Sequence, residues 1–162
     1  MNTVFRHLFH YHFSENKRVL NLVRKLESKQ LHEEVKYSIG SIMNHVQHLV
    51  YVDDGWLSDI ADLVPLIDDP KELGLEALMD FTMDIEKRMF TFLSEQTDDG
   101  FFKQPIKDGE DKDLYLWQIL FHMVNHGTDH RAQLHRLLHD QGVTTHSQDY
   151  VFHAYDNPVT SP

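Results

Sequence analysis

The sequence predicts an all-α fold, a four-helix bundle with short polar connections and a partly packed C-terminal tail. Three observations predict it. Four long stretches repeat apolar side chains at the three-to-four-residue spacing of an amphipathic helix. Polar segments that contain glycine or proline separate these stretches. The chain has 162 residues, which suits a single domain over 1–162 with a core of its own.

The expected helices have ordinary start and stop signals. The second should end before Pro65, because proline lacks the amide hydrogen that a helix interior needs. The last should close at Gly142, since glycine commonly follows a helix C-terminus. In the tail, aromatic residues around Tyr150 suggest partial packing, and residues 157–162 are expected to fray. The four predicted helices are residues 4–27, 39–64, 73–95 and 114–140.

Composition and charge exclude several classes of function. The net charge is -11, with 15 Lys and Arg against 26 Asp and Glu, so the clustered positive charge of a nucleic-acid binder is missing. The chain has no cysteine, which excludes disulfides, thiolate metal sites and a cysteine nucleophile. No signal peptide and no membrane-spanning run are legible. We therefore expect a cytoplasmic protein that binds neither nucleic acid nor membrane.

Three histidines stand four residues apart in the last predicted helix: His122, His126 and His130. On a helical wheel, His130 falls inside the apolar arc, His126 at its border, and His122 further out on the same side. Two imidazoles at this spacing are costly to bury without partners, and one divalent cation satisfies both. His126 and His130 are therefore candidate metal ligands.

The second predicted helix offers a third ligand and a buried carboxylate. On its wheel, His45 lies nearer the apolar arc than His48, so geometry slightly favours His45 as the ligand. Asp53 falls in the middle of that arc, where a carboxylate is expensive unless it is paired. It either bonds to a histidine or arginine of another helix, or orients a ligand imidazole or accepts a proton near the metal.

These residues carry a resemblance to a known family. His48-Leu, Asp53 and Trp56-Leu, followed by His122-Met-Val-Asn-His126-Gly-Thr-Asp-His130-Arg-Ala-Gln, resemble the DinB-like superfamily of bacterial damage-inducible proteins, which is unrelated to the DNA polymerase of the same name. The resemblance also takes in the opening stretch 10–16 and the tail segment 148–152.

The resemblance implies a four-helix bundle, often a homodimer, that holds a divalent metal ion, nickel or zinc, with three histidines. Carried onto this chain, the first ligand is His48, because it stands eight residues before Trp56. The other two are His126 and His130. The resemblance overrules the wheel preference for His45, which stays as the fallback.

Three imidazoles leave positions on a metal for water or substrate. The resemblance implies a thiol-dependent S-transferase in some relatives, so a small-molecule substrate and a low-molecular-weight thiol are the expected partners, with hydrolysis as the other chemistry. A metalloprotease is disfavoured, because Gly127 stands where the general base of His-Glu-x-x-His belongs. Asp53 and His122 are the candidate catalytic residues, ahead of Asp129.

Two rival readings remain: a non-catalytic metal-binding stress-response bundle, and a structural dimer with vestigial histidines. Several other polar residues are expected to be structural. Arg131 should pair with one of the many acidic residues, and His135 should be exposed. His7, His10 and His12 stand close together in the first predicted helix but do not share one helical face, so they are taken as incidental.

Overall fold

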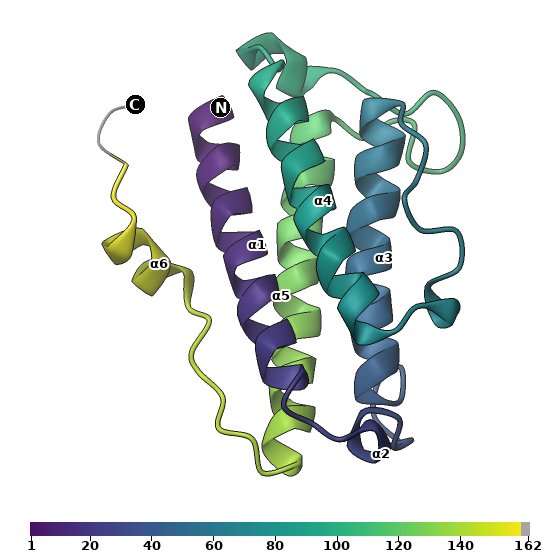
Figure 1. Ribbon diagram of the computed structural model, residues 1–162. Coiled ribbons are helices and arrows are strands. Elements are labelled where there is room, and N and C mark those ends of the chain that lie inside the picture. Colours follow the sequence, from purple (N-terminus) through teal and green to yellow (C-terminus); the bar gives the residue numbers. More distant parts are fainter. Residues whose placement is uncertain (160–162) are drawn as a thin grey trace.

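The computed structural model describes residues 1–159, and its regular elements are all helical. The long helices lie side by side and form a bundle (Figure 1). The all-α bundle predicted from the sequence is therefore correct. The residues 160–162 that were expected to fray lie outside the described part. The four long helices are α1 (Asn2–Val23), α3 (Ile42–Ala61), α4 (Leu75–Ser94) and α5 (Leu116–Asp140).

Each long helix packs on two neighbours. α1 and α3 each contact both α4 and α5, so α1 and α3 are diagonally opposed across the bundle. α1 and α5 run in one direction and α3 and α4 in the other, and residues 62–74 therefore cross back along the whole bundle (Figure 1). Because α3 and α5 are antiparallel neighbours, side chains from the middle of each can face one another.

The core is formed by the apolar faces that the helical spacing predicts. Phe9, Phe13, Leu49, Leu120 and Leu134 are fully buried. Burying one such side chain stabilises the fold by roughly 1.5–3 kcal/mol. Polar groups nevertheless occupy the centre of this core, among them His12, Asn16, Asp53 and Arg131.

The boundaries of the second predicted helix were wrong by about one turn. α3 begins at Ile42, because Gly40 has a positive φ of 98° and the Ser41 hydroxyl accepts the amide of Asn44 at 3.2 Å. It ends at Ala61, since Asp62 is left-handed with φ 53°. The first helix also ends earlier than predicted, at Val23, and a separate short helix, α2 (Ser28–Leu31), follows it. Two 3-10 turns occupy Pro70–Glu72 and Asp98–Phe102.

The C-terminal tail follows the bundle surface and ends in α6 (Tyr150–Asp156), which has no buried residue. It is fastened by a few polar contacts: the Tyr11 hydroxyl donates to the Gln148 carbonyl at 2.5 Å, and His7 Nδ1 lies 2.9 Å from the Tyr150 hydroxyl. The side chains that the sequence predicted to pack down are exposed, Phe152 and Tyr155 among them, so the tail is held mainly by these polar contacts. Among residues 1–159, no helix is long and apolar enough to cross a membrane.

Candidate metal centre

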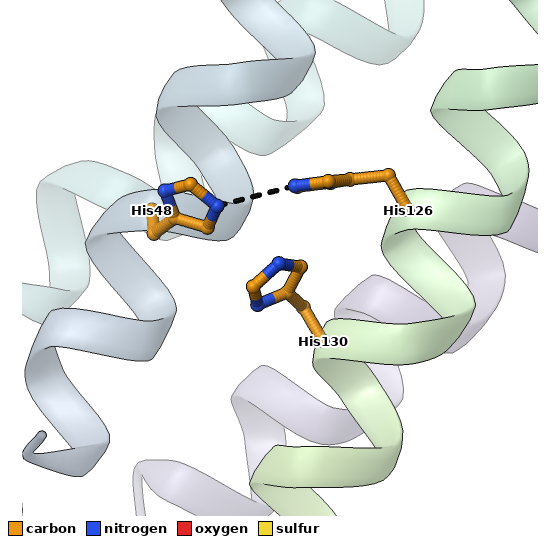
Figure 2. A group of neighbouring side chains, drawn as sticks. All are labelled: His48, His126 and His130. Carbon is orange, nitrogen blue, oxygen red and sulfur yellow. Dashed lines mark hydrogen bonds between the residues drawn. The ribbon is translucent and has the colours of Figure 1, made fainter. Parts of the chain in front are cut away.

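Three histidines from two helices meet between α3 and α5. His48 comes from α3, and His126 and His130 from successive turns of α5, as Figure 2 shows. One ring nitrogen of each can be chosen so that all three lie within 4.8 Å of one another. The Nε2 atoms of His48 and His126 are 3.1 Å apart. These are the three residues that the resemblance selected.

Helix geometry explains why the rings converge. Residues four apart on α5 stand one above the other, and the His126 and His130 ring centroids are 4.3 Å apart. The antiparallel α3 places His48 opposite this pair, with its ring centroid 4.5 Å from that of His130. His48 and His126 are partly buried, so the site reaches solvent.

The site keeps its imidazoles neutral. Burial, followed by the nearby His130 and His48, lowers the pKa of His126 to about 4. Burial also lowers the pKa values of His48 and His130. A group whose pKa falls below 6.5 is unprotonated at neutral pH, so each ring has a lone pair to offer. Metal binding needs this form of histidine.

The three residues fit a divalent ion. Zinc binds imidazole nitrogen at about 2.0–2.1 Å, which puts two ligands of a tetrahedral site roughly 3.3 Å apart. The His48 to His126 separation is close to that value. Without an ion, the same separation requires a proton on one of the two nitrogens. Three neutral imidazoles are a donor set that suits zinc and nickel. The group could therefore hold a metal ion.

His45, the alternative ligand, lies beside this group and outside it. Its ring centroid is 6.2 Å from that of His130 and 6.5 Å from that of Tyr37. Both of its ring nitrogens are buried and have no hydrogen-bond partner among residues 1–159. Burial, with the charges of His130 and His48, lowers its pKa to about 4. The nitrogens that come within 4.8 Å of one another belong to His48, His126 and His130.

Asp53 bonds to a different histidine. Its Oδ2 accepts from His12 Nε2 at 2.8 Å and from Asn16 Nδ2 at 3.0 Å, while Oδ1 is buried and has no partner in the described part of the chain. This bond crosses the bundle between the diagonal helices α1 and α3. The view of His12 as incidental was wrong, because the residue is fully buried. His12 stands three residues after Phe9 and four before Asn16, on the buried side of α1. This helical spacing was the signal in the sequence that His12 is a core residue.

Gly127 lets α1 approach α5 at the level of the metal ligands. A Cβ at this position would lie 2.7 Å from His12 Nδ1 and 2.9 Å from Arg131 Nη1, closer than real Cβ contacts. Glycine therefore stands in the middle of this helix because His12 occupies the space of a side chain. Packing therefore explains the glycine that distinguishes this sequence from the metalloprotease motif.

The prediction that Arg131 pairs with an acidic residue was also wrong. The guanidinium is fully buried and donates to Asn16 Oδ1 at 2.6 Å, Thr128 Oγ1 at 3.1 Å and Gln148 Oε1 at 3.0 Å. Among the described residues, all of these acceptors are neutral. Burial lowers its pKa, and Tyr11 and Asp53 act in the opposite direction. Arg131 joins α5 to α1 and to the tail.

Three other predicted residues lie around the site. His122 is exposed, with its ring centroid 5.3 Å from that of Trp56 and 5.7 Å from that of His126. Asp129 is exposed and accepts from Gln133 Nε2 at 3.0 Å. His135, expected to be exposed, is partly buried, and both of its ring nitrogens are buried with no hydrogen-bond partner within the described residues.

A helical bundle in which three imidazoles from two helices converge defines the class: a four-helix protein with a candidate metal centre. The model of the DinB family matches residues 1–158, and the chain therefore belongs to the DinB family. It is similar to Protein DinB of Bacillus subtilis (strain 168), with 26% identity over 154 residues that cover 88% of this chain and 89% of the relative. The resemblance drawn from the histidine motif is confirmed.

Proposed function

We propose that the protein is a metal-dependent enzyme in which His48, His126 and His130 hold one nickel or zinc ion. The observation that carries the proposal is the group of three neutral imidazoles, open to solvent at His48 and His126, whose nitrogens lie within 4.8 Å of one another. Three protein ligands leave at least one position for another molecule, which is typical of catalytic sites. Thiol-dependent S-transfer to a small molecule is the proposed reaction, with hydrolysis as the alternative.

The proposal divides the work between the metal and the protein. When bound, a divalent ion would lower the pKa of a water or thiol beside it and so supply a nucleophile near neutral pH. His122, exposed and near His126, would accept or return the proton. Trp56 would limit access on one side, since its ring packs edge-on against His122. A buried Asp53, bonded to His12, suits positioning better than proton exchange with a substrate.

The second candidate function is a non-catalytic metal-binding protein of the stress response. A structural metal site is closed, with four protein ligands. The partial exposure of His48 and His126 favours the enzyme. A homodimer, a low-molecular-weight thiol as partner and a cytoplasmic location belong to the same proposal and rest on the resemblance and the composition.

Elemental analysis of untagged protein purified without chelator tests the metal site. We expect about one equivalent of nickel or zinc in the wild type, loss in His48→Ala and His126→Ala, and retention in the matched control His45→Ala. A wild type that takes up no metal even after reconstitution would end the proposal. Loss of metal in His45→Ala with retention in His48→Ala would move the ligand.

Cobalt-substituted protein then tests whether a thiol can bind at the site. A thiolate that binds Co²⁺ gives a sulfur-to-metal charge-transfer band, so cysteine and glutathione can be titrated against the protein as probes. We expect such a band in the wild type and its absence in His126→Ala. A cobalt spectrum that no thiol changes would argue against S-transfer and leave hydrolysis or simple metal binding.

A further inference from the structure

Several buried polar atoms near the metal centre have no hydrogen-bond partner among the described residues. Besides both ring nitrogens of His45 and Nδ1 of His130, they include Asp53 Oδ1 and His126 Nδ1. A buried donor or acceptor without a partner costs free energy, so native structures rarely keep one. Asp53 Oδ1 is an acceptor. His126 Nδ1 is a donor whenever its ring carries the proton there.

The two residues share one neighbourhood in the core. Asp53 binds His12 through Oδ2, and the His12 ring lies directly against Gly127, the residue after His126. Arg131 Nη1 lies 3.4 Å from His12 Nδ1, which makes that nitrogen an acceptor and leaves the proton of His12 on Nε2, toward Asp53. Burial lowers the pKa of His126, and the Asp53 carboxylate acts on that pKa in the opposite direction.

The orientation of His126 decides which tautomer a metal would need. Its Nε2 points toward His48, as Figure 2 shows, so Nε2 is the nitrogen that meets the other ligands. A neutral imidazole that binds a metal through Nε2 carries its hydrogen on Nδ1. Metal-binding histidines almost always donate this hydrogen to a carboxylate, a carbonyl or water.

We propose that Asp53 is a positioning residue whose Oδ1 accepts the Nδ1 hydrogen of His126 through one bound water, and so holds the tautomer that frees Nε2 for metal. His12 and Asn16 hold the other carboxylate oxygen and keep Asp53 in place. The inference rests on the proposed metal site. It gives Asp53 a role that acts through a ligand and needs no contact with substrate.

Nuclear magnetic resonance of protein labelled with ¹⁵N-histidine tests the tautomer in the wild type, with no variant needed. Long-range ¹H–¹⁵N spectra of metal-free protein should show His126 protonated on Nδ1, with the same form after zinc is added. A His126 that carries its proton on Nε2 in the metal-free protein overturns the inference.

The variant Asp53→Asn measures the effect on metal. The asparagine can turn its oxygen toward His12 and Asn16, which leaves its amide to face His126 as a donor and favours the wrong tautomer. We expect a zinc dissociation constant 10 to 100 times that of the wild type. The matched control is Asp54→Asn, since Asp54 is equally buried on the same helix but accepts from the amides of Leu66 and Ile67.

A folded Asp53→Asn protein with the zinc affinity of the wild type would overturn the inference, as would an equal loss in Asp54→Asn. The tautomer is read without metal, so its outcome is independent of the proposed function. A wild type that binds no zinc would refute the metal site, whereas a His126 that carries its hydrogen on Nε2 would refute the inference about Asp53 whether or not zinc binds.

Discussion

At the scale of one residue, Gly127 shows how core packing restricts which side chains α5 can carry beside the candidate ligand His126. In an isolated helix, alanine is more favourable than glycine by about 1 kcal/mol. Here the added methyl group would lie 2.7 Å from His12 Nδ1, and His12 is fully buried and bonded to Asp53. The ring cannot move aside without breaking that bond. Packing therefore decides against the helix propensity at this position.

We predict that Gly127→Ala lowers the free energy of unfolding by about 1–3 kcal/mol, the usual cost of overpacking a core. Urea denaturation measures it as a lower midpoint. The control is Gly55→Ala in the interior of α3, where a Cβ meets nothing within 4 Å and alanine should stabilise the protein by up to about 1 kcal/mol. Equal stabilisation by both substitutions would show that His12 does not fill this space.

His135 makes the stability of the protein depend on pH. Burial, followed by the charge of His146, lowers its pKa to about 4, although Glu15 acts in the opposite direction. The unfolded chain has the ordinary value of 6.5, so between pH 6.5 and 4 it binds a proton that the folded chain does not. The contribution of His135 to stability is therefore complete above pH 6.5 and declines as the pH falls toward 4.

We predict that His135→Leu loses less stability than the wild type between pH 7.5 and 4.5. At 1.36 kcal/mol per pKa unit the ceiling is roughly 3 kcal/mol, and partial exposure of the ring reduces the expected difference to about 1 kcal/mol. Urea denaturation at the two pH values measures it. His139→Leu, on the exposed face one turn later, is the control and should follow the wild type. If the stability of the wild type and of His135→Leu falls by the same amount between the two pH values, His135 is not the source of the pH dependence.

At the scale of elements, the long helices and their buried faces could be predicted from sequence, because apolar spacing is a local signal repeated over many residues. The ends could not. α3 begins one turn late because Gly40 and Ser41 take turn and capping conformations, and it ends early at a left-handed Asp62. Single backbone angles decide such ends, and periodicity does not encode them.

The site divides in the same way. The i, i+4 histidines of α5 are local in sequence, and they could be found from it. The partners of Asp53 and Arg131 are not local: Asp53 reaches His12 across 41 residues, and Arg131 reaches Asn16 across 115. Only the packing of diagonal and neighbouring helices reveals that His12 and Arg131 are core residues. Their tertiary contacts, and not a sequence pattern, place these two residues beside the candidate site.

The tail is an element held by very few contacts. Gln148 Oε1 accepts from Arg131, its Nε2 donates to the Thr128 carbonyl at 3.3 Å, and its own carbonyl accepts from Tyr11. We predict that Gln148→Ala speeds limited proteolysis between residues 143 and 159 several-fold while the midpoint of global unfolding changes little. Asp149→Ala is the control, because its side chain bonds only to Ser147 within the tail. Unchanged cleavage in Gln148→Ala would show that other contacts hold the segment.

At the scale of the whole molecule, the core and the metal centre are separable sources of stability. The apolar core fills the bundle on both sides of the histidines and does not depend on them. A bundle of this kind should keep its fold when metal is removed, unlike small domains that fold only around an ion. Bound metal should still add stability, since any ligand that prefers the folded state does so.

We predict that chelation leaves the helical circular dichroism of the protein unchanged at 25 °C but lowers Tm. Free zinc at 100 times its dissociation constant stabilises the folded state by about 2.7 kcal/mol. For a chain of this length that corresponds to roughly 5–10 °C in Tm. His126→Ala should lose the zinc-dependent increase and keep its helices, because the side chain is a proposed ligand outside the apolar core, whereas His45→Ala should keep the increase. Complete loss of helical signal on chelation would instead identify a structural metal site, and with it the non-catalytic reading of this bundle.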